Sequence, residues 1–118
     1  MGSFELSGQD LSVRYTAHNK TLVVHGKDLV GQDEQTFSDV KLVESGIGVT
    51  ITVVLLISSR NGTKISLHLL VPSTARAAKG AAITGVAIVV SDFSQLIDGA
   101  PPVLQAYVTK SLSGTMHA

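Results

Sequence analysis

Residues 49–71 decide the fold of this chain, and they read VTITVVLLISSRNGTKISLHLLV. Two runs rich in β-branched and aliphatic residues flank a polar segment that contains Asn61 and Gly62. Asn-Gly between two such runs is the strongest short signal for a β-hairpin, because both residues tolerate the positive φ of a two-residue turn. The stretch therefore predicts a hairpin of two antiparallel strands, Val49–Ser58 and Lys64–Val71.

The register of this hairpin follows from its turn. If the Asn-Gly pair forms the loop, Val53 faces Leu70 across the two strands. Both faces are then apolar, with Ile51, Val53, Leu55, Ile57 and Leu70 on one and Val54, Leu56, Leu67 and Leu69 on the other. A single sheet buries one face on its own core, and monomers rarely expose a large apolar patch. We expect a second copy to cover the other face, in a homodimer through residues 49–71; the alternative cover is residues 73–80 or a terminal strand.

Similar patterns occur on both sides of this hairpin. Val, Ile and Thr account for 32 of the 118 residues and are grouped in short runs between Gly, Asn, Asp and Ser. Further strands are predicted at residues 11–16, 21–25, 36–44, 83–90 and 103–116, with an eighth if residues 4–6 pair. Residues 73–80 predict at most one short helix ending at Gly80, or an ordered loop. Seven or eight antiparallel strands predict a small β-barrel, with a two-sheet β-sandwich as the alternative.

The length and composition exclude several classes of protein. A chain of 118 residues predicts a single all-β domain over residues 1–118. A formal net charge of zero argues against nucleic acid and anionic membranes as partners. The longest apolar stretch, Val53–Ile57, is too short for a membrane-spanning helix. With no cysteine and no signal-peptide pattern at the N-terminus, we expect a cytoplasmic protein without disulfides or thiol chemistry. Apolar residues make up 44% and charged residues 15%, which leaves little charge to solvate a monomer and favours an oligomer.

Two residues are candidates for acid–base chemistry or ligand binding inside a barrel. His68 lies in the middle of a predicted strand among leucines, so in the interior it could act as a general base or hydrogen-bond donor. The alternative for His68 is a structural histidine at a strand edge or subunit contact. Tyr15 alternates in phase with Leu11 and Val13 and should point inward, whereas Arg14 should point outward. Tyr15 is equally explained as an amphipathic residue that fills the core.

Two further residues are candidates for ligand contacts. Tyr107 lies between Ala106 and Val108, so the pattern leaves its direction open. Arg76 lies in residues 45–91, which contain four basic residues and no Asp or Glu, and it could attract an anion. The alternative for Arg76 is a solvated turn whose charge maintains solubility.

No motif indicates a metal or cofactor. His25 and His68 could form a metal pair, but the sequence has no His-x-His or carboxylate spacing to support it. It also lacks a dinucleotide-binding or phosphate-binding glycine loop. We therefore predict no metal and no cofactor.

Three functions fit these observations. The leading hypothesis is an oligomeric, cytoplasmic β-barrel that binds a small hydrophobic molecule in its interior, since apolar strand residues are many and aromatic residues are few. The second is a cofactor-free isomerase or cyclase that uses the same cavity, with His68 or Tyr15 as the acid or base. The third is a structural or protein-interaction module with a packed core.

Overall fold

The residues that the structure describes form nine β-strands in a single antiparallel sheet. The structure, a computed structural model, describes residues 2–26, 29, 33–56, 64–72, 78–92 and 105–117. The strands are β1 (Phe4–Gly8), β2 (Leu11–Thr16), β3 (Thr21–His25), β4 (Glu34–Phe37), β5 (Val43–Ser45), β6 (Gly48–Leu55), β7 (Lys64–Pro72), β8 (Ala82–Asp92) and β9 (Gln105–Met116). Buried and more exposed side chains alternate along β2, β6 and β7, as in strands with one face on a core. The prediction of an all-β fold is confirmed.

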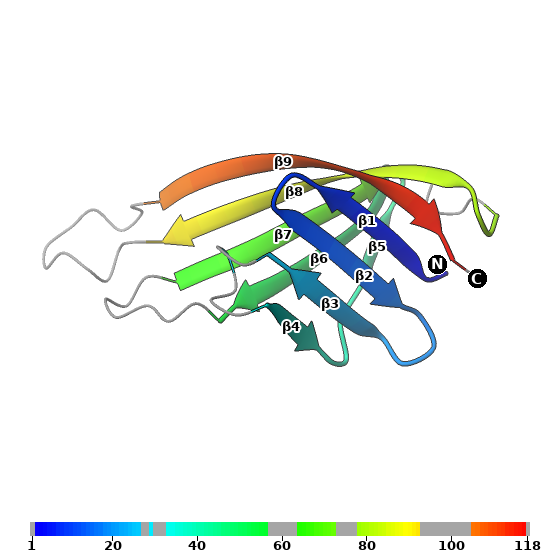
Figure 1. Ribbon diagram of the computed structural model, residues 1–118, viewed down its shortest axis with the longest axis horizontal. Helices are drawn as coiled ribbons and strands as arrows, with labels where there is room; N and C mark the ends of the chain where they lie inside the picture. The colour runs from blue at the N-terminus through cyan, green and yellow to red at the C-terminus, as the bar shows by residue number, and fades with distance from the viewer. Residues whose placement is uncertain are drawn as a thin grey trace, which may run out of the picture.

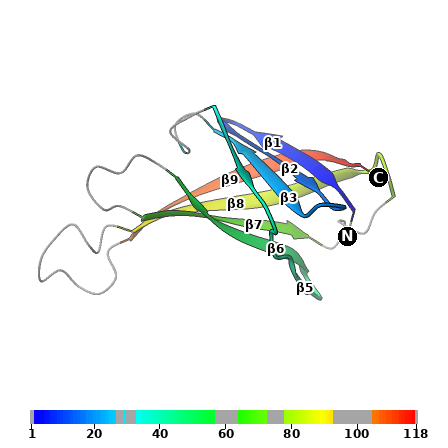
Figure 2. The same ribbon diagram turned by 90° about the horizontal axis from the view of Figure 1, so that it is seen from below.

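The sheet curls into a half-barrel, in which β1 to β3 lie across from β6 to β8 (Figures 1 and 2). The strand order is β4-β3-β2-β1-β9-β8-β7-β6-β5. All neighbouring strands in this order run antiparallel, and β1 at the start of the chain pairs with β9 at its end. This is the order of an up-and-down barrel that is open between β4 and β5. It confirms the predicted barrel-like architecture, and one continuous sheet takes the place of the alternative two-sheet sandwich.

The predicted continuous strand at residues 36–44 is wrong, because the chain forms two strands, β4 and β5, over this region. Asp39 adopts a φ of 54°, in the left-handed region that interrupts an extended strand. Val40 is buried and donates its backbone N–H to the carbonyl oxygen of Lys20 at 2.9 Å, so this segment packs beside the β2–β3 turn. The division gives nine strands instead of the predicted seven or eight.

The hairpin of β6 and β7 is confirmed, but its predicted register is wrong. Val53 pairs with Leu67 and not with Leu70. A shift by three residues turns β7 over relative to β6, so that Leu67 and Leu69 are buried and His68 is exposed. Burying each leucine contributes roughly 1.5 to 3 kcal/mol, which outweighs the preference for a two-residue turn. The turn residues 57–63 lie outside the described residues.

The corrected register changes the outer face of this hairpin. Within the described residues that face carries Thr50, Thr52, Val54, Leu56, Ser66, His68 and Leu70. It is therefore mixed and not uniformly apolar, although Val54 and Leu56 are 51% and 71% exposed. The homodimer through residues 49–71 stays a prediction, with a smaller apolar face to support it.

The predicted short helix or loop at residues 73–80 falls mostly outside the described residues. Gly80 lies in a turn with a φ of 83°, the left-handed conformation predicted for this glycine. Its N–H donates to the carbonyl oxygen of Met116 at 2.7 Å, which ties the start of β8 to the end of β9. In the part of the chain that the structure describes, no helix has the length and apolar character needed to cross a membrane.

The core lies on the concave face of the sheet and joins the two halves of the half-barrel. Its largest fully buried side chains are Phe4, Leu6, Val13, Leu22, Val24, Ile51, Leu67, Leu69 and Val71. These residues belong to one cluster that receives side chains from β1, β2 and β3 on one side and from β6 to β9 on the other. Hydrophobic burial between the halves therefore stabilises the curl of the sheet.

Two contacts stabilise the curl of the sheet. At Gly114 on β9, an added Cβ would clash with the backbone carbonyl of Glu5 on β1. The glycine therefore permits the close approach of the two terminal strands. On the open side, Gln35 of β4 is buried, and its Oε1 accepts the N–H of Leu56, just after β6, at 2.9 Å. This side-chain amide connects edge strand β4 to the opposite half of the sheet.

We expect Gly114→Ala to lower the free energy of unfolding by about 1 to 3 kcal/mol, because the backbones of β1 and β9 must separate to admit the methyl group. Gly46→Ala is the matched control, since a Cβ at Gly46 meets nothing within 4 Å. Urea unfolding followed by circular dichroism measures both variants. Equal free energies for the two variants would contradict the close approach at Gly114.

We expect Gln35→Met to lower the free energy of unfolding by about 1 kcal/mol, because the shape is kept while the acceptor for Leu56 is lost. Gln9→Met, at an exposed position in the turn between β1 and β2, is the control and should change it by less than about 0.5 kcal/mol. The same urea titration applies. A Gln35→Met protein as stable as the parent would show that this hydrogen bond does not stabilise the curl of the sheet.

Candidate functional site

A cluster of functional side chains forms where the chain termini meet at one end of the half-barrel. Phe4 of β1 and Tyr15 of β2 are paired residues on the concave face. Their rings stack with centroids 5.5 Å apart and an interplanar angle of 29°. The inward direction predicted for Tyr15 is confirmed, since the residue is 3% exposed, and Arg14 is exposed as predicted.

Backbone contacts of Ser3 fix this end of the sheet. Its carbonyl oxygen accepts the N–H of His117 at 2.8 Å, which continues the β1–β9 ladder beyond Met116. The hydroxyl Oγ of Ser3 accepts the N–H of Ala17 at 2.9 Å. Ser3 therefore links the residues that follow β9 and β2 and positions His117 beside Tyr15.

A surface hollow of about 210 Å³ opens between these residues and is lined by Ser3, Phe4, Arg14, Tyr15, Thr16 and His117. Phe4 and Tyr15, whose rings stack, are the aromatic residues of this lining, and Ser3, Arg14, Thr16 and His117 are its polar residues. Binding pockets for drug-sized ligands usually measure about 300 to 1,000 Å³. The hollow therefore suits a small molecule or one group of a larger one.

The electrostatics of the hollow are set by Tyr15 and Arg14. Burial raises the pKa of Tyr15 above its ordinary value, because the phenolate is poorly solvated. Tyr15 is thus neutral near physiological pH and can donate a hydrogen bond, but it is a poor general base. Arg14 forms no hydrogen bond or ion pair with another described residue, so its guanidinium is available to an anion.

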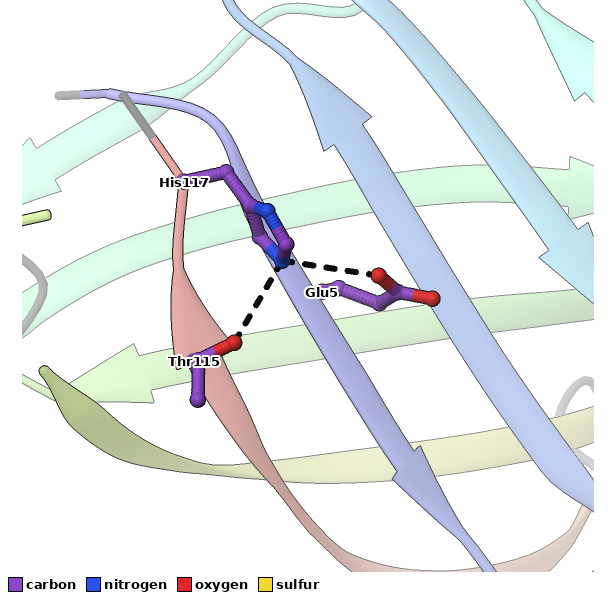
Figure 3. Close-up of polar contacts among 3 residues, drawn as sticks. All are labelled: Glu5, Thr115 and His117. Atoms are coloured by element: carbon purple, nitrogen blue, oxygen red, sulfur yellow. Dashed lines mark hydrogen bonds and ion pairs between the residues drawn. The ribbon is translucent and has the colours of Figure 1, made fainter. Parts of the chain in front are cut away.

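His117 is held on the outer side of the hollow by two polar contacts (Figure 3). Its Nε2 lies 3.5 Å from Oε2 of Glu5 and 3.3 Å from Oγ1 of Thr115. The His117 and Glu5 side chains are 53% and 52% exposed, so water screens their attraction and leaves His117 free to change partner. Sequence analysis missed His117, Ser3 and Glu5, because no local pattern shows that the two termini are adjacent.

A second hollow of about 130 Å³ lies on the outer face of β1 to β4. It is lined by Glu5, Ser12, Val13, Arg14, Val23, His25 and Glu34. His25 is the last residue of β3, and His68 lies on β7 in the opposite half of the sheet. The two histidines therefore do not form the metal pair considered from the sequence. Among the described residues, no three His, Asp or Glu side chains lie close enough to hold a metal ion.

His68 lies on the outer face of β7, so the interior position considered for it is wrong. Its Nδ1 is 3.2 Å from Oγ1 of Thr52, and its Nε2 is 3.2 Å from Oγ of Ser66. Both ring nitrogens are therefore bound by hydroxyls. A polar, exposed strand position of this kind explains the residue without a catalytic role.

The remaining predicted site residues lie elsewhere. Tyr107 is 63% exposed near the start of β9, at the other end of this strand from His117, and its hydroxyl donates to Oε1 of Gln105. Arg76 lies outside the described residues. Of the four predicted ligand-binding residues, the structure thus brings Tyr15 to the hollow and places His68 and Tyr107 apart from it.

No family model, curated protein or solved structure matches this chain. The proposed role of the hollow therefore depends on its own geometry and chemistry.

Proposed function

We propose that this chain is a cytoplasmic small-molecule-binding protein whose ligand is a small organic anion with an aromatic group. The observation that supports the proposal is a hollow whose lining combines Arg14, which forms no ion pair with another described residue, with the stacked Phe4 and Tyr15. The proposal keeps a small ligand, but it replaces the hydrophobic molecule expected from the sequence with an anion that has an aromatic group. It moves that ligand from the barrel interior, where the described apolar side chains pack into one core cluster, to the end of the half-barrel.

Each side of the hollow recognises one part of such a ligand. The Arg14 guanidinium pairs with a carboxylate or phosphate through two parallel hydrogen bonds, a geometry that lysine does not offer. Phe4 and Tyr15 are 0% and 3% exposed, so an aromatic group contacts their rings only when the surrounding side chains shift. The neutral Tyr15 hydroxyl then acts as a hydrogen-bond donor.

A binding role fits these residues better than the isomerase or cyclase alternative. That reaction needs two acid–base groups that converge on one substrate. Tyr15 faces the concave side and has a raised pKa, whereas His68 lies outside on β7. The two residues considered as catalytic groups therefore do not act on one substrate.

We expect benzoate to bind in the hollow, with the neutral benzyl alcohol at least about tenfold weaker because it cannot pair with Arg14. Two-dimensional amide NMR should show the largest shifts at Ala17 and His117, whose N–H groups bond to Ser3. Arg14→Met should weaken benzoate binding about tenfold. Lys41→Met removes the same charge from an exposed position outside the hollow and should leave binding unchanged.

Equal weakening by Arg14→Met and Lys41→Met would contradict the proposal, because it would indicate unspecific attraction of the anion. The same holds if benzoate shifts amides elsewhere and leaves Ala17 and His117 unchanged.

We expect the phenol of Tyr15 to ionise above the ordinary tyrosine pKa of 10.0, because burial disfavours the phenolate. Absorbance of tyrosinate should continue to rise above pH 10.0 during alkaline titration, and Tyr15→Phe should remove this late rise. Because the pKa is raised in the folded state, the stability from the neutral phenol is present below the unfolded value of 10.0 and is lost as pH rises through the folded value. A late rise that Tyr15→Phe leaves unchanged would show that Tyr15 is not shielded from water.

A further inference from the structure

Strand β9 has one edge that is only partly paired. On one side it pairs with β8 over its whole length, from Gln105↔Asp92 to Thr115↔Ala82. On the other side it pairs with β1 only from Ser113 to Met116. Figure 1 shows β9 continuing well past the end of β1. Among the described residues, no strand pairs with this edge over Gln105–Lys110.

The described residues also leave this edge uncovered. All residues from Gln105 to Thr109 are exposed, and successive side chains of a strand point to opposite faces of the sheet. Tyr107, on the outer face, is 63% exposed, and Val108, on the concave face, is 53% exposed. The backbone N–H and C=O groups on this edge are therefore accessible to another strand.

The other two sheet edges are short. β4 has four residues and β5 has three, and the Gln35 side chain of β4 already reaches across to Leu56. Short edge strands are a common protection against unwanted pairing. The edge of β9 is longer, and its residues Tyr107, Val108 and Thr109 are good strand formers. Within the described chain, β9 thus presents the most complete template for strand addition.

We propose that β9 pairs in antiparallel fashion with β9 of a second copy of this chain, through the edge of Gln105–Lys110. A two-fold axis between two identical strands generates antiparallel pairing directly. Lys110 is the single charged residue in this segment, and a pairing centred on Val108 places it opposite Ala106. The formal net charge of the chain is zero, so two copies do not repel each other at long range.

The pairing also covers apolar surface on both faces of the sheet. Tyr107 meets Thr109 of the second copy on the outer face, and Val108 meets its own equivalent on the concave face. Cross-strand pairs of aromatic and β-branched residues are favourable. The contact is small, so we expect a reversible dimer and not a permanent one.

The first test measures mass by sedimentation equilibrium over a range of protein concentrations. Thr109→Lys adds a positive charge beside Lys110 on each copy and should weaken dimerisation about tenfold or more. Thr52→Lys is the matched control. Across the sheet Thr109 pairs with Ile88, Ile88 with His68 and His68 with Thr52. Thr52 therefore lies in the same row of paired residues as Thr109, but on β6 and away from the β9 edge. It should leave the dimer unchanged.

The second test removes backbone donors with Val108→Pro and Thr109→Pro. Successive N–H groups along a strand point to opposite edges, so one substitution removes a donor from the free edge and the other removes one that faces β8. Along β9 the N–H of Met116 donates towards β8, to Ala81, and the N–H of His117 donates to Ser3, on the side of β1, so even-numbered N–H groups face β8 and odd-numbered ones face the free edge. Thr109→Pro should therefore keep its circular dichroism spectrum and become monomeric, whereas Val108→Pro should lose stability.

Several outcomes would overturn the proposal. One is a parent protein that is monomeric at all concentrations, and another is a dimer that both proline variants retain. A dimer that is lost in Val54→Glu but kept in Thr109→Lys would locate the contact on the outer face of the β6–β7 hairpin instead. Equal loss in Thr109→Lys and Thr52→Lys would indicate that added charge, and not the β9 edge, is responsible.

Discussion

The pairing of β1 with β9 is the constraint on which the rest of the structure depends. Four residue pairs, from Phe4↔Met116 to Ser7↔Ser113, join the first and last strands of the chain. Without them, β1 to β4 and β5 to β9 would be two separate antiparallel sheets, each with an unburied apolar face. The pairing brings these faces together on one core, which repays the entropy of closing a loop of nearly the whole chain.

The candidate ligand site and the free sheet edge are both consequences of this pairing. Adjacent termini place Ser3 and His117 beside Tyr15, so that residues from both ends of the chain line one hollow. β1 is much shorter than β9, so the ladder stops at Ser113 and leaves the remainder of β9 unpaired on that side. The hollow lies at the Met116 end of β9 and the free edge at the Gln105 end. The proposed ligand binding and the proposed self-association therefore involve separate parts of the molecule.

Local sequence patterns predicted strands and turns well, but they did not predict how strands pair. The β2–β3 hairpin follows from strict alternation over Leu11–Thr16, where each inward residue is apolar. In β6 and β7 apolar residues occur at both parities, so alternation leaves the register open and the turn residues alone suggested it. The core decided otherwise, because Leu67 and Leu69 gain more from burial than a two-residue turn contributes. The same shift moved His68 out of the interior.

The sequence by itself determined the all-β class, the position of most strands, the inward direction of Tyr15 and the left-handed turn at Gly80, because each depends on neighbouring residues and on backbone sterics. Only the tertiary structure decided the β6–β7 register, the break at Asp39, the proximity of His117 to Tyr15 and the open edge of β9. These features depend on contacts between segments far apart in the chain. Such contacts form where the apolar side chains are buried and the backbone groups are hydrogen-bonded at the same time, and a short stretch of sequence does not contain both partners of these contacts.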